Sequence, residues 1–427
     1  MSRSYKPYPK YKPSGIEWLG DVPEHWEVRR LKTLCSMKSG EGITNDSIDH
    51  VGKYPVYGGN GIRGYTNRYT HDGEFVLIGR QGALCGNVYI ARGRFWASEH
   101  AVVVSMQNNH SIRWLNFLLF AMNLNKYSTA SAQPGLAVER ISNISVPVPQ
   151  FSEQSTIATY LDHQTARIDQ LIDKKEQFIK LLQEKRTALI TAAVTGRFDV
   201  RTGKPYPKYK PSGIEWLGDV PEHWEVKAIK RSFQVVGGST PKSGDPSFWD
   251  GDIVWVTPAD LSRLESKWIG DSGRKITLKG LASCGSNLIP AGTIILSTRA
   301  PIGSMAIASK PLCTNQGCKS LVPNRNTNTD FFSYYLSICV EQLNVRGKGT
   351  TFLELSEDEL GAFESISPPL PEQSAIATYL DHQTFRIDQL IEKTRQSIEL
   401  LKEKRTALIT AAVTGKIDVR DWTPEAA

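Results

Sequence analysis

The sequence predicts an α+β fold: two globular domains in a pseudo-twofold tandem, separated by two long helices that form an antiparallel coiled coil. Two repeats predict this architecture. The passage at 6–28 recurs letter for letter at 204–226. The passage at 153–201 recurs at 372–420 with 39 of 49 positions identical. A period of about 200 residues in a chain of 427 indicates two similar halves.

Between the repeats the sequence is different in the two halves. Residues 29–152 and 227–371, here called the first and second insert domains, share little sequence, and the repeated parts form a frame around them. The predicted segments are an N-terminal strap and first domain at 1–152, a long helix at 153–201, a repeated strap and second domain at 202–371, and a second long helix with a tail at 372–427. Two different inserts in one frame indicate two recognition surfaces presented to one kind of partner.

The long helices are the clearest predicted elements. Residues 153–195 contain no Gly or Pro, and Gly196 is a typical residue just after a helix. Apolar residues recur every seven positions, which is typical of a coiled coil. The expected interface residues are Leu161, Ile168, Leu171, Leu182 and Leu189 in the first helix and Leu380, Ile387, Leu390, Leu401 and Leu408 in the second. Connectivity favours antiparallel pairing, with packing of each helix against its own domain as the alternative.

The insert domains mix short strand-like runs with Gly- and Asn-rich turns, as α+β domains do. Predicted strands lie at 75–78, 101–105, 253–257 and 293–297. Apolar helical stretches lie at 114–124 and 331–343.

The composition describes a soluble globular protein, with 40% hydrophobic and 22% charged residues. No apolar run is long enough to span a bilayer, so we expect a cytoplasmic protein without a membrane partner. The six cysteines form no CxxC pair, which favours free thiols in a reducing compartment and no metal site. A net charge of +7 is compatible with a polyanionic partner.

Several motifs together resemble one family. They are SGIEWLGDVPEHWEV at 14–28 and 212–226, the KRTALITAAVTG endings of both helices, YPVYGGNGIRGY and VLIGRQGALCGNVYI in the first insert, and STRAPIGSMAIA and TNQGCK in the second. The chain resembles the specificity subunits of type I restriction-modification systems, and the resemblance covers essentially its whole length.

The resemblance implies that the chain has no catalytic activity. Each insert would be a target recognition domain that reads one half of a bipartite, asymmetric site in double-stranded DNA, and the helices would set the spacer. The implied protein partners are two modification (methyltransferase) subunits and two restriction (translocase and nuclease) subunits. S-adenosylmethionine, ATP and Mg would belong to those partners, with no cofactor in this chain.

The motifs that are missing agree with a non-catalytic chain. An amino-methyltransferase of this kind carries Asn/Asp-Pro-Pro-Tyr/Phe, and the nearest match, at 367–370, reads SPPL. No GxxxxGK[ST] phosphate loop is present. GGNGIRG at 58–64 lacks the strand and helix that a dinucleotide loop requires.

Side-chain chemistry indicates the candidates for DNA contact, because cations meet phosphates while guanidinium and amide groups meet base edges. The candidates follow predicted strands or lie in Gly-rich loops, with a solvated surface role as the alternative for each. Segments 79–82 and 298–303 suggest one equivalent loop in both inserts, as do 131–141 and 346–360. The candidates are Asn60, Arg63, Tyr65, Arg80 and Gln81 in the first insert and Arg299, Asn315, Gln316, Lys319 and Lys348 in the second.

A second hypothesis belongs to another class of protein. The same pattern fits a non-catalytic, two-headed adaptor that binds proteins with both domains on a coiled-coil stalk. Salt dependence separates the two, because DNA binding releases counterions and weakens steeply with salt.

Overall fold

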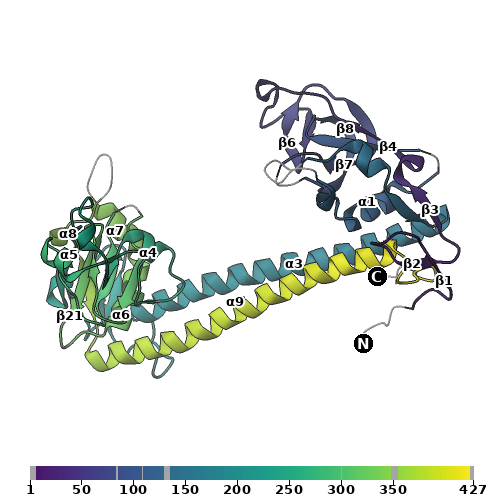
Figure 1. Cartoon of the computed structure of the whole chain (residues 1–427). Coiled ribbons are helices and arrows are strands. Elements are labelled where there is room, and N and C mark those ends of the chain that lie inside the picture. Colours follow the sequence, from purple (N-terminus) through teal and green to yellow (C-terminus); the bar gives the residue numbers. More distant parts are fainter. Residues whose placement is uncertain are drawn as a thin grey trace. The chain divides into compact units, whose positions relative to one another are not determined.

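The computed structural model describes residues 6–82, 85–107, 109–128, 135–299, 301–347 and 354–423. It divides into two compact units, residues 1–176 with 394–427 and residues 177–393. Each unit holds one insert domain and half of each long helix (Figure 1). The helices are α3 (Phe151–Val194) and α9 (Leu370–Val413), each of 44 residues. The candidate Lys348 lies outside the described residues.

The first unit is built on a sheet with strand order β4-β9-β7-β8-β5-β6. Its pairs are antiparallel except for β5 and β8, which run parallel. Buried Trp114, Leu115 and Leu118 of α1 join sheet residues in the main core. The strands are β4 (Cys35–Ser39), β5 (Tyr54–Gly58), β6 (Gly61–Thr66), β7 (His71–Gly79), β8 (Val88–Ala97) and β9 (Ala101–Met106), and the helices are α1 (Ile112–Ala121) and α2 (Val138–Ser142).

The second unit contains a sheet of order β14-β21-β18-β19-β16 and a smaller one of order β17-β15-β20. Phe331, Phe332 and Tyr335 of α6 are fully buried in its core. The strands are β14 (Phe233–Gly237), β15 (Trp249–Val256), β16 (Trp268–Ile269), β17 (Lys275–Ile276), β18 (Ile294–Ser297), β19 (Met305–Ala308), β20 (Cys313–Thr314) and β21 (Cys318–Pro323). The helices are α4 (Pro258–Ser262), α5 (Leu278–Ala282), α6 (Thr329–Ile338), α7 (Val340–Arg346) and α8 (Glu357–Gly361).

The strand predictions at 75–78, 101–105, 253–257 and 293–297 fall on β7, β9, β15 and β18. The stretch 331–343 is divided at Cys339 into α6 and α7. Single-turn 3-10 helices lie at Leu31–Thr33, Asn45–Ser47, Leu124–Tyr127, Ile229–Arg231 and Pro246–Phe248.

Within each unit, α3 and α9 lie side by side in opposite directions (Figure 1). In the first unit the start of α3 and the end of α9 share a core that includes Leu161, Ile168 and Leu408. In the second unit Leu182 of α3 contacts Ile387 and Ile391 of α9. The same helices also pack against their own domains, as Leu380 does in the core of the second unit. Antiparallel pairing and packing on the domain therefore occur together.

Two predicted interface residues are wrong. Leu171 and Leu390 are 48% and 47% exposed. The residue that packs at the helix interface is the next one in the sequence: Ile172, which is partly buried, and Ile391, which is buried. Residues three and four positions after Ile168 or Ile387 both lie near the same face of the helix as that residue. Both positions hold an aliphatic residue here, so the sequence alone does not show which of the two is buried. The other eight predicted positions are buried or partly buried: Leu161, Ile168, Leu182, Leu189, Leu380, Ile387, Leu401 and Leu408.

The repeated strap (6–28 and 204–226) is fastened by a buried glutamate at the start of each long helix. Glu153 accepts hydrogen bonds from Tyr8 (2.7 Å) and Trp26 (3.0 Å), and its carboxylate lies 2.9 Å from His25 Nε2. Glu372 has the equivalent partners in the second unit: Trp224 at 2.9 Å, Tyr206 at 3.4 Å and His223 at 3.0 Å. Two letter-for-letter copies of the strap therefore make the same buried contacts.

The strap forms paired strands in both units. The pairs are β1 (Tyr11–Pro13) with β2 (Asp21–Pro23), β3 (Glu27–Arg30) with β10 (Ser145–Val148), β11 (Tyr209–Pro211) with β12 (Asp219–Pro221), and β13 (Glu225–Ala228) with β22 (Glu364–Ser367).

The segment after each long helix also contacts a strap. In the first unit the N–H of Asp418, after α9, donates to the carbonyl oxygen of Lys6 at 2.8 Å. In the second unit the N–H of Asp199, after α3, donates to the carbonyl oxygen of Lys204 at 2.8 Å. Each strap thus meets the start of one long helix and the end of the other.

Candidate nucleic-acid interface

In the first unit, the turn between β5 and β6 packs against the segment that follows β7. Asn60 is exposed in this turn, and its Oδ1 accepts a hydrogen bond from Asn87 at 2.5 Å. A side chain at Gly59 would come within 3.5 Å of the carbonyl oxygens of Gln81 and His100. Arg63 lies exposed on β6 with its stem against Gly58. Asn60, Arg63 and Gln81 are therefore brought to one edge of the domain.

The segment after β7 is held by backbone hydrogen bonds on both sides. The N–H of Arg80 donates to the carbonyl oxygen of His100 (2.9 Å), and the carbonyl oxygen of Arg80 accepts from Leu136 (3.0 Å). Gln81 is exposed, and Arg80 is half-buried. Tyr65 is half-buried further along β6, where its backbone pairs with Asp49, so it lies away from this edge of the sheet.

The second unit repeats this arrangement after β18. The N–H of Thr298 donates to the carbonyl oxygen of Gly317 (2.8 Å), and the carbonyl oxygen of Thr298 accepts from Leu355 (2.9 Å). Arg299 follows, and its Nε donates to Glu354 Oε2 at 3.1 Å. The guanidinium is thereby held at the loop edge with a carboxylate partner.

The remaining candidates of the second unit lie in the next loop. Asn315 Oδ1 accepts the N–H of Gly317 (3.0 Å), so this side chain shapes the turn. Gln316 is exposed, and its amide oxygen accepts a hydrogen bond from Thr240. The Lys319 side chain is only 12% exposed, with Nζ 3.7 Å from Glu357 Oε1. That burial favours a structural role for Lys319.

The matching backbone bonds align the two domains residue by residue. Arg80 corresponds to Thr298, because each donates to the loop before β9 or β21 and each accepts from the leucine at 136 or 355. Gln81 therefore corresponds to Arg299, and Glu99 to Gln316. Different side chains occupy one backbone framework in the two domains.

The sequence interpretation missed Ser98, Glu99 and His100, which form the first-domain counterpart of Asn315–Gly317. Glu99 is 39% exposed, with Oε1 at 3.1 Å from His100 Nε2. The signal was present in the chain, since both ASEHA and TNQGC stand directly before a buried strand.

The buried cysteine thiols have raised pKa values. Burial raises the pKa of the Cys35, Cys318 and Cys339 thiols to about 12, which keeps them protonated at neutral pH. Across the described ranges, no group of three His, Cys, Asp or Glu side chains is placed to hold a metal ion. In the same ranges no helix has an apolar stretch long enough to cross a membrane.

Comparison with known families finds the same family in each half of the chain. A family described as the type I restriction modification DNA specificity domain matches residues 23–181 and again residues 221–400. The chain belongs to this family. Each match covers one insert domain with part of its strap and long helix, as the repeat predicts.

Relatives within the specificity-subunit family include two from Methanocaldococcus jannaschii and one from Escherichia coli. The type I restriction enzyme MjaIX specificity subunit is 39% identical over 190 residues, which cover 44% of this chain and 43% of the relative. The E. coli EcoprrI specificity subunit is 44% identical over 161 residues, 37% and 40% of the two chains. The chain thus spans less than half the length of these two. The putative MjaX subunit is 25% identical over 94% of this chain and 96% of its own.

Solved structures of the specificity-subunit family share the fold. A chain from a study of complex assembly and conformational transition in the type I R-M system aligns over 93% of this chain and 99% of its own, with a TM-score of 0.66 and 17% identity. The HsdS subunit from Thermoanaerobacter tengcongensis aligns over 93% and 98%, with a TM-score of 0.55 and 17% identity. At this identity the likeness concerns the fold alone.

Proposed function

We propose that this chain is the DNA sequence-specificity subunit of a type I restriction-modification complex. Each insert domain reads one half of a bipartite, asymmetric site in double-stranded DNA. The supporting observation is the shared backbone framework that presents Gln81 and Glu99 in one domain and Arg299 and Gln316 in the other. Amide, carboxylate and guanidinium groups select different base edges, so the same framework reads two different half-sites.

The paired helices set the gap between the half-sites. Arg405 of α9 donates to Asp169 of α3 at 2.9 Å in the first unit, and Arg186 lies 3.3 Å from Asp388 in the second. Ion pairs at matching positions fix the register of two helices, as charged flanks do in coiled coils. A fixed register gives a fixed spacer.

The chain also acts as a scaffold for two modification subunits. Leu171 and Leu390 are equivalent in the repeat and 48% and 47% exposed, and Leu181 and Leu400 are equivalent and 61% and 65% exposed. Two equivalent exposed apolar surfaces can each bind one copy of the same protein, which supports the binding of two copies of one modification subunit. Two restriction subunits complete the complex in the cytoplasm. Methyl transfer and ATP-driven cleavage, with S-adenosylmethionine, ATP and Mg, belong to those partners, and this chain is non-catalytic.

The test is to co-express the chain with its methyltransferase subunit in bacteria that lack DNA methylation and to map modified bases by single-molecule sequencing. A split motif with two defined halves, a constant gap and N6-methyladenine is expected. Soluble, associated proteins without any methylated motif would overturn the proposal and favour the protein-binding adaptor. The proposal would also be overturned if the affinity of the complex for DNA changed little between low and high salt.

A further inference from the structure

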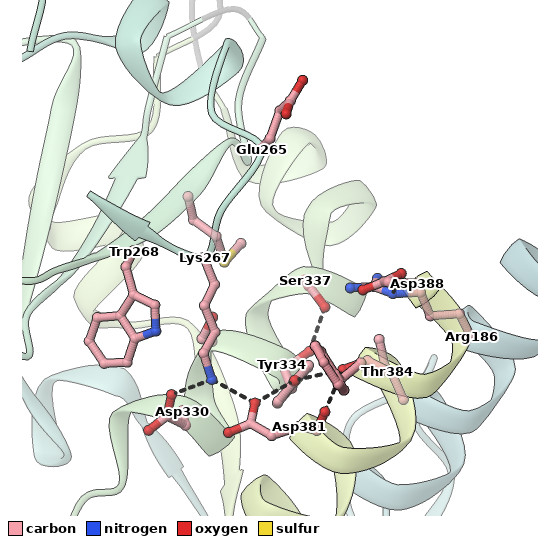
Figure 2. Close-up of a pocket in the computed structure, with 14 residues that line it drawn as sticks. Arg186, Glu265, Lys267, Trp268, Asp330, Tyr334, Ser337, Asp381, Thr384 and Asp388 are labelled. Carbon is pink, nitrogen blue, oxygen red and sulfur yellow. Dashed lines mark hydrogen bonds and ion pairs between the residues drawn. The ribbon is translucent and has the colours of Figure 1, made fainter. Parts of the chain in front are cut away.

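One aspartate of the repeated helix meets a cation from its own insert domain in both units. Asp162 and Asp381 occupy the same position of the repeat, LDH. In the first unit Asp162 forms an ion pair with Arg113 of α1. In the second unit Asp381 Oδ1 accepts a hydrogen bond from Lys267 Nζ at 2.6 Å (Figure 2). The aspartate is constant, whereas the cation differs in type and in origin.

The difference is explained by the helix that faces each aspartate. The N–H of Ser111, the N-cap of α1, donates to Gln154 at 2.9 Å, and the N–H of Asn328, the N-cap of α6, donates to Gln373 at 2.8 Å. Since Gln154 and Gln373 are equivalent in the repeat, the two helices are equivalent from their first residue.

This alignment places Asp330 of α6 where α1 has Arg113. Two aspartates would then face each other in the second unit, and like charges at such a distance repel. Lys267, just before β16, lies between them and donates to Asp330 at 2.9 Å as well as to Asp381. The second insert domain thus supplies a cation from another segment to meet the same acceptor.

The contact is extended by further side chains in the second unit. Tyr334 of α6 donates its hydroxyl to Asp381 Oδ1 at 2.7 Å and lies 3.2 Å from the hydroxyl of Thr384. These residues line a pocket of about 660 Å³ beside the helices, with Glu265 and Trp268 at the insert-domain side (Figure 2). These polar bonds with defined directions lie beside the apolar contacts that Ile376 and Leu380 make with the same domain.

Burial opposes the two contacts to different degrees. Burial raises the pKa of Asp162 above its ordinary value, although Arg113 opposes the rise, so the ion pair does not fully offset the loss of water. For Lys267, burial lowers the pKa and the bonds to Asp381 and Asp330 raise it, with a net rise. Partly exposed ion pairs contribute little to unfolding free energy. Their directional geometry is what they contribute.

We propose that Asp162 and Asp381 are positioning residues, each the constant acceptor that fixes the orientation of an insert domain on its helix. This inference rests on the proposed function: with the orientation fixed, each domain meets the DNA at a defined distance along the helix pair, so only one gap length is accepted. An insert domain can be exchanged without loss of this selectivity only if the new domain brings a cation to the same aspartate.

The experiment compares gap selectivity in complexes that carry Lys267→Met, Lys267→Met with Asp330→Arg, or the control Lys310→Met. Lys310 is exposed in the same unit, so its change removes an equal charge. The double variant places an arginine at the position that Arg113 occupies in the first unit. Methylated sites are mapped genome-wide and sorted by half-site bases and by gap length.

Lys267→Met is expected to leave both half-sites unchanged and to raise methylation at gaps one base pair longer or shorter roughly five-fold relative to the native gap. The double variant and Lys310→Met are expected to keep the native gap selectivity. Unchanged selectivity in Lys267→Met, or a double variant no better than the single one, would overturn the inference. Uniformly lower methylation without new gaps would mean a purely structural contact and would overturn it too.

Two further variants guard against a complex that fails to assemble. Asp381→Asn removes the acceptor charge while Lys267 keeps Asp330, and Arg113→Met tests the first unit; both are expected to relax the gap in the same way. If both keep the native gap, the positioning role is excluded. A wild-type complex that methylates no split motif would instead overturn the proposed function, so the two failures are distinguishable.

Discussion

Arg405 Nε donates to Asp169 Oδ1 at 2.9 Å, joining the last third of α9 to the first half of α3 within the first unit. The same two positions of the repeat, Asp388 and Arg186, lie 3.3 Å apart in the second unit with the helices exchanged. Each helix therefore contributes one aspartate and one arginine, and equivalent residues of the repeat pair with each other within each unit.

Reversing one charge of this pair should weaken the helix pairing. Asp169→Arg would place two cations together and is expected to lower the free energy of unfolding by about 1 kcal/mol, a small effect because both side chains are partly exposed. Asp169→Arg with Arg405→Asp should restore most of the loss. Urea unfolding of the natural chain and the two variants measures these free energies. A double variant no more stable than the single one would contradict the Asp169–Arg405 ion pair.

Loss of the buried Glu153 should lower the free energy of unfolding more than loss of the Asp169–Arg405 ion pair. Glu153→Ala leaves the Tyr8 hydroxyl and the Trp26 indole N–H buried without their acceptor, so we expect a loss of roughly 3 kcal/mol in unfolding free energy. Glu17→Ala, an exposed residue of the same strap, is the control. Equal melting temperatures for the two variants would show that the acceptor is dispensable.

The stability of the strap contacts should depend on pH in one direction. The hydrogen bond from Arg201 holds the pKa of Asp199 below its ordinary value of 3.8. A lowered pKa in the folded state means stabilisation that is present above 3.8 and is lost as the pH falls through the lowered pKa. Asp199→Asn should therefore be less stable than the natural chain at pH 7, and the difference should be smaller at pH 2. Denaturant unfolding at pH 7 and at pH 2 measures the difference in unfolding free energy between the two proteins. A larger difference at pH 2 than at pH 7 would contradict a lowered pKa for Asp199.

The loop edges should control the half-sites independently. Glu99→Gln replaces a pure acceptor by an amide and is expected to change the base accepted at one position of the first half-site, at a discrimination of about 1–3 kcal/mol. Arg299→Gln should act only on the second half-site. Methylation mapping reads both, with Glu17→Gln as the control. A change in both half-sites from one substitution would refute independent reading.

The exposed leucines should control the number of modification subunits. Leu400→Glu places a charge on the apolar surface of the first unit and should remove one partner copy, with roughly ten-fold weaker binding. Leu181→Glu should act in the same way in the second unit, and the two changes together should leave no bound partner. Native mass spectrometry counts the copies, and Leu278→Glu, at a leucine 78% exposed in the second insert domain, is the control. Full occupancy in the double variant would place the partners elsewhere.

The repeated frame was predictable from the sequence because identity and heptad spacing are visible in the letters. The long helices, the strands β7, β9, β15 and β18, and the Leu161–Ile168 stripe followed from these patterns. The choice between Leu171 and Ile172 did not, because both lie close to the same helix face.

The loop edges were less predictable because their geometry depends on partners far away in the chain. Lys319 looks like a free cation in the sequence, yet Glu357 lies beside it in space and its side chain is nearly enclosed. Glu99 was missed because its equivalence to Gln316 rests on backbone hydrogen bonds and not on similar side chains. Which loop residues read bases stays a prediction.

The contact between Asp418 and Lys6 has a topological consequence. In the second unit the equivalent residues, Asp199 and Lys204, are joined by a short run of chain, whereas Asp418 and Lys6 lie far apart along the sequence and meet through the hydrogen bond. Cutting the chain at Gly203 should therefore leave the second unit folded, because the first unit makes the same contact between residues that are distant in the sequence.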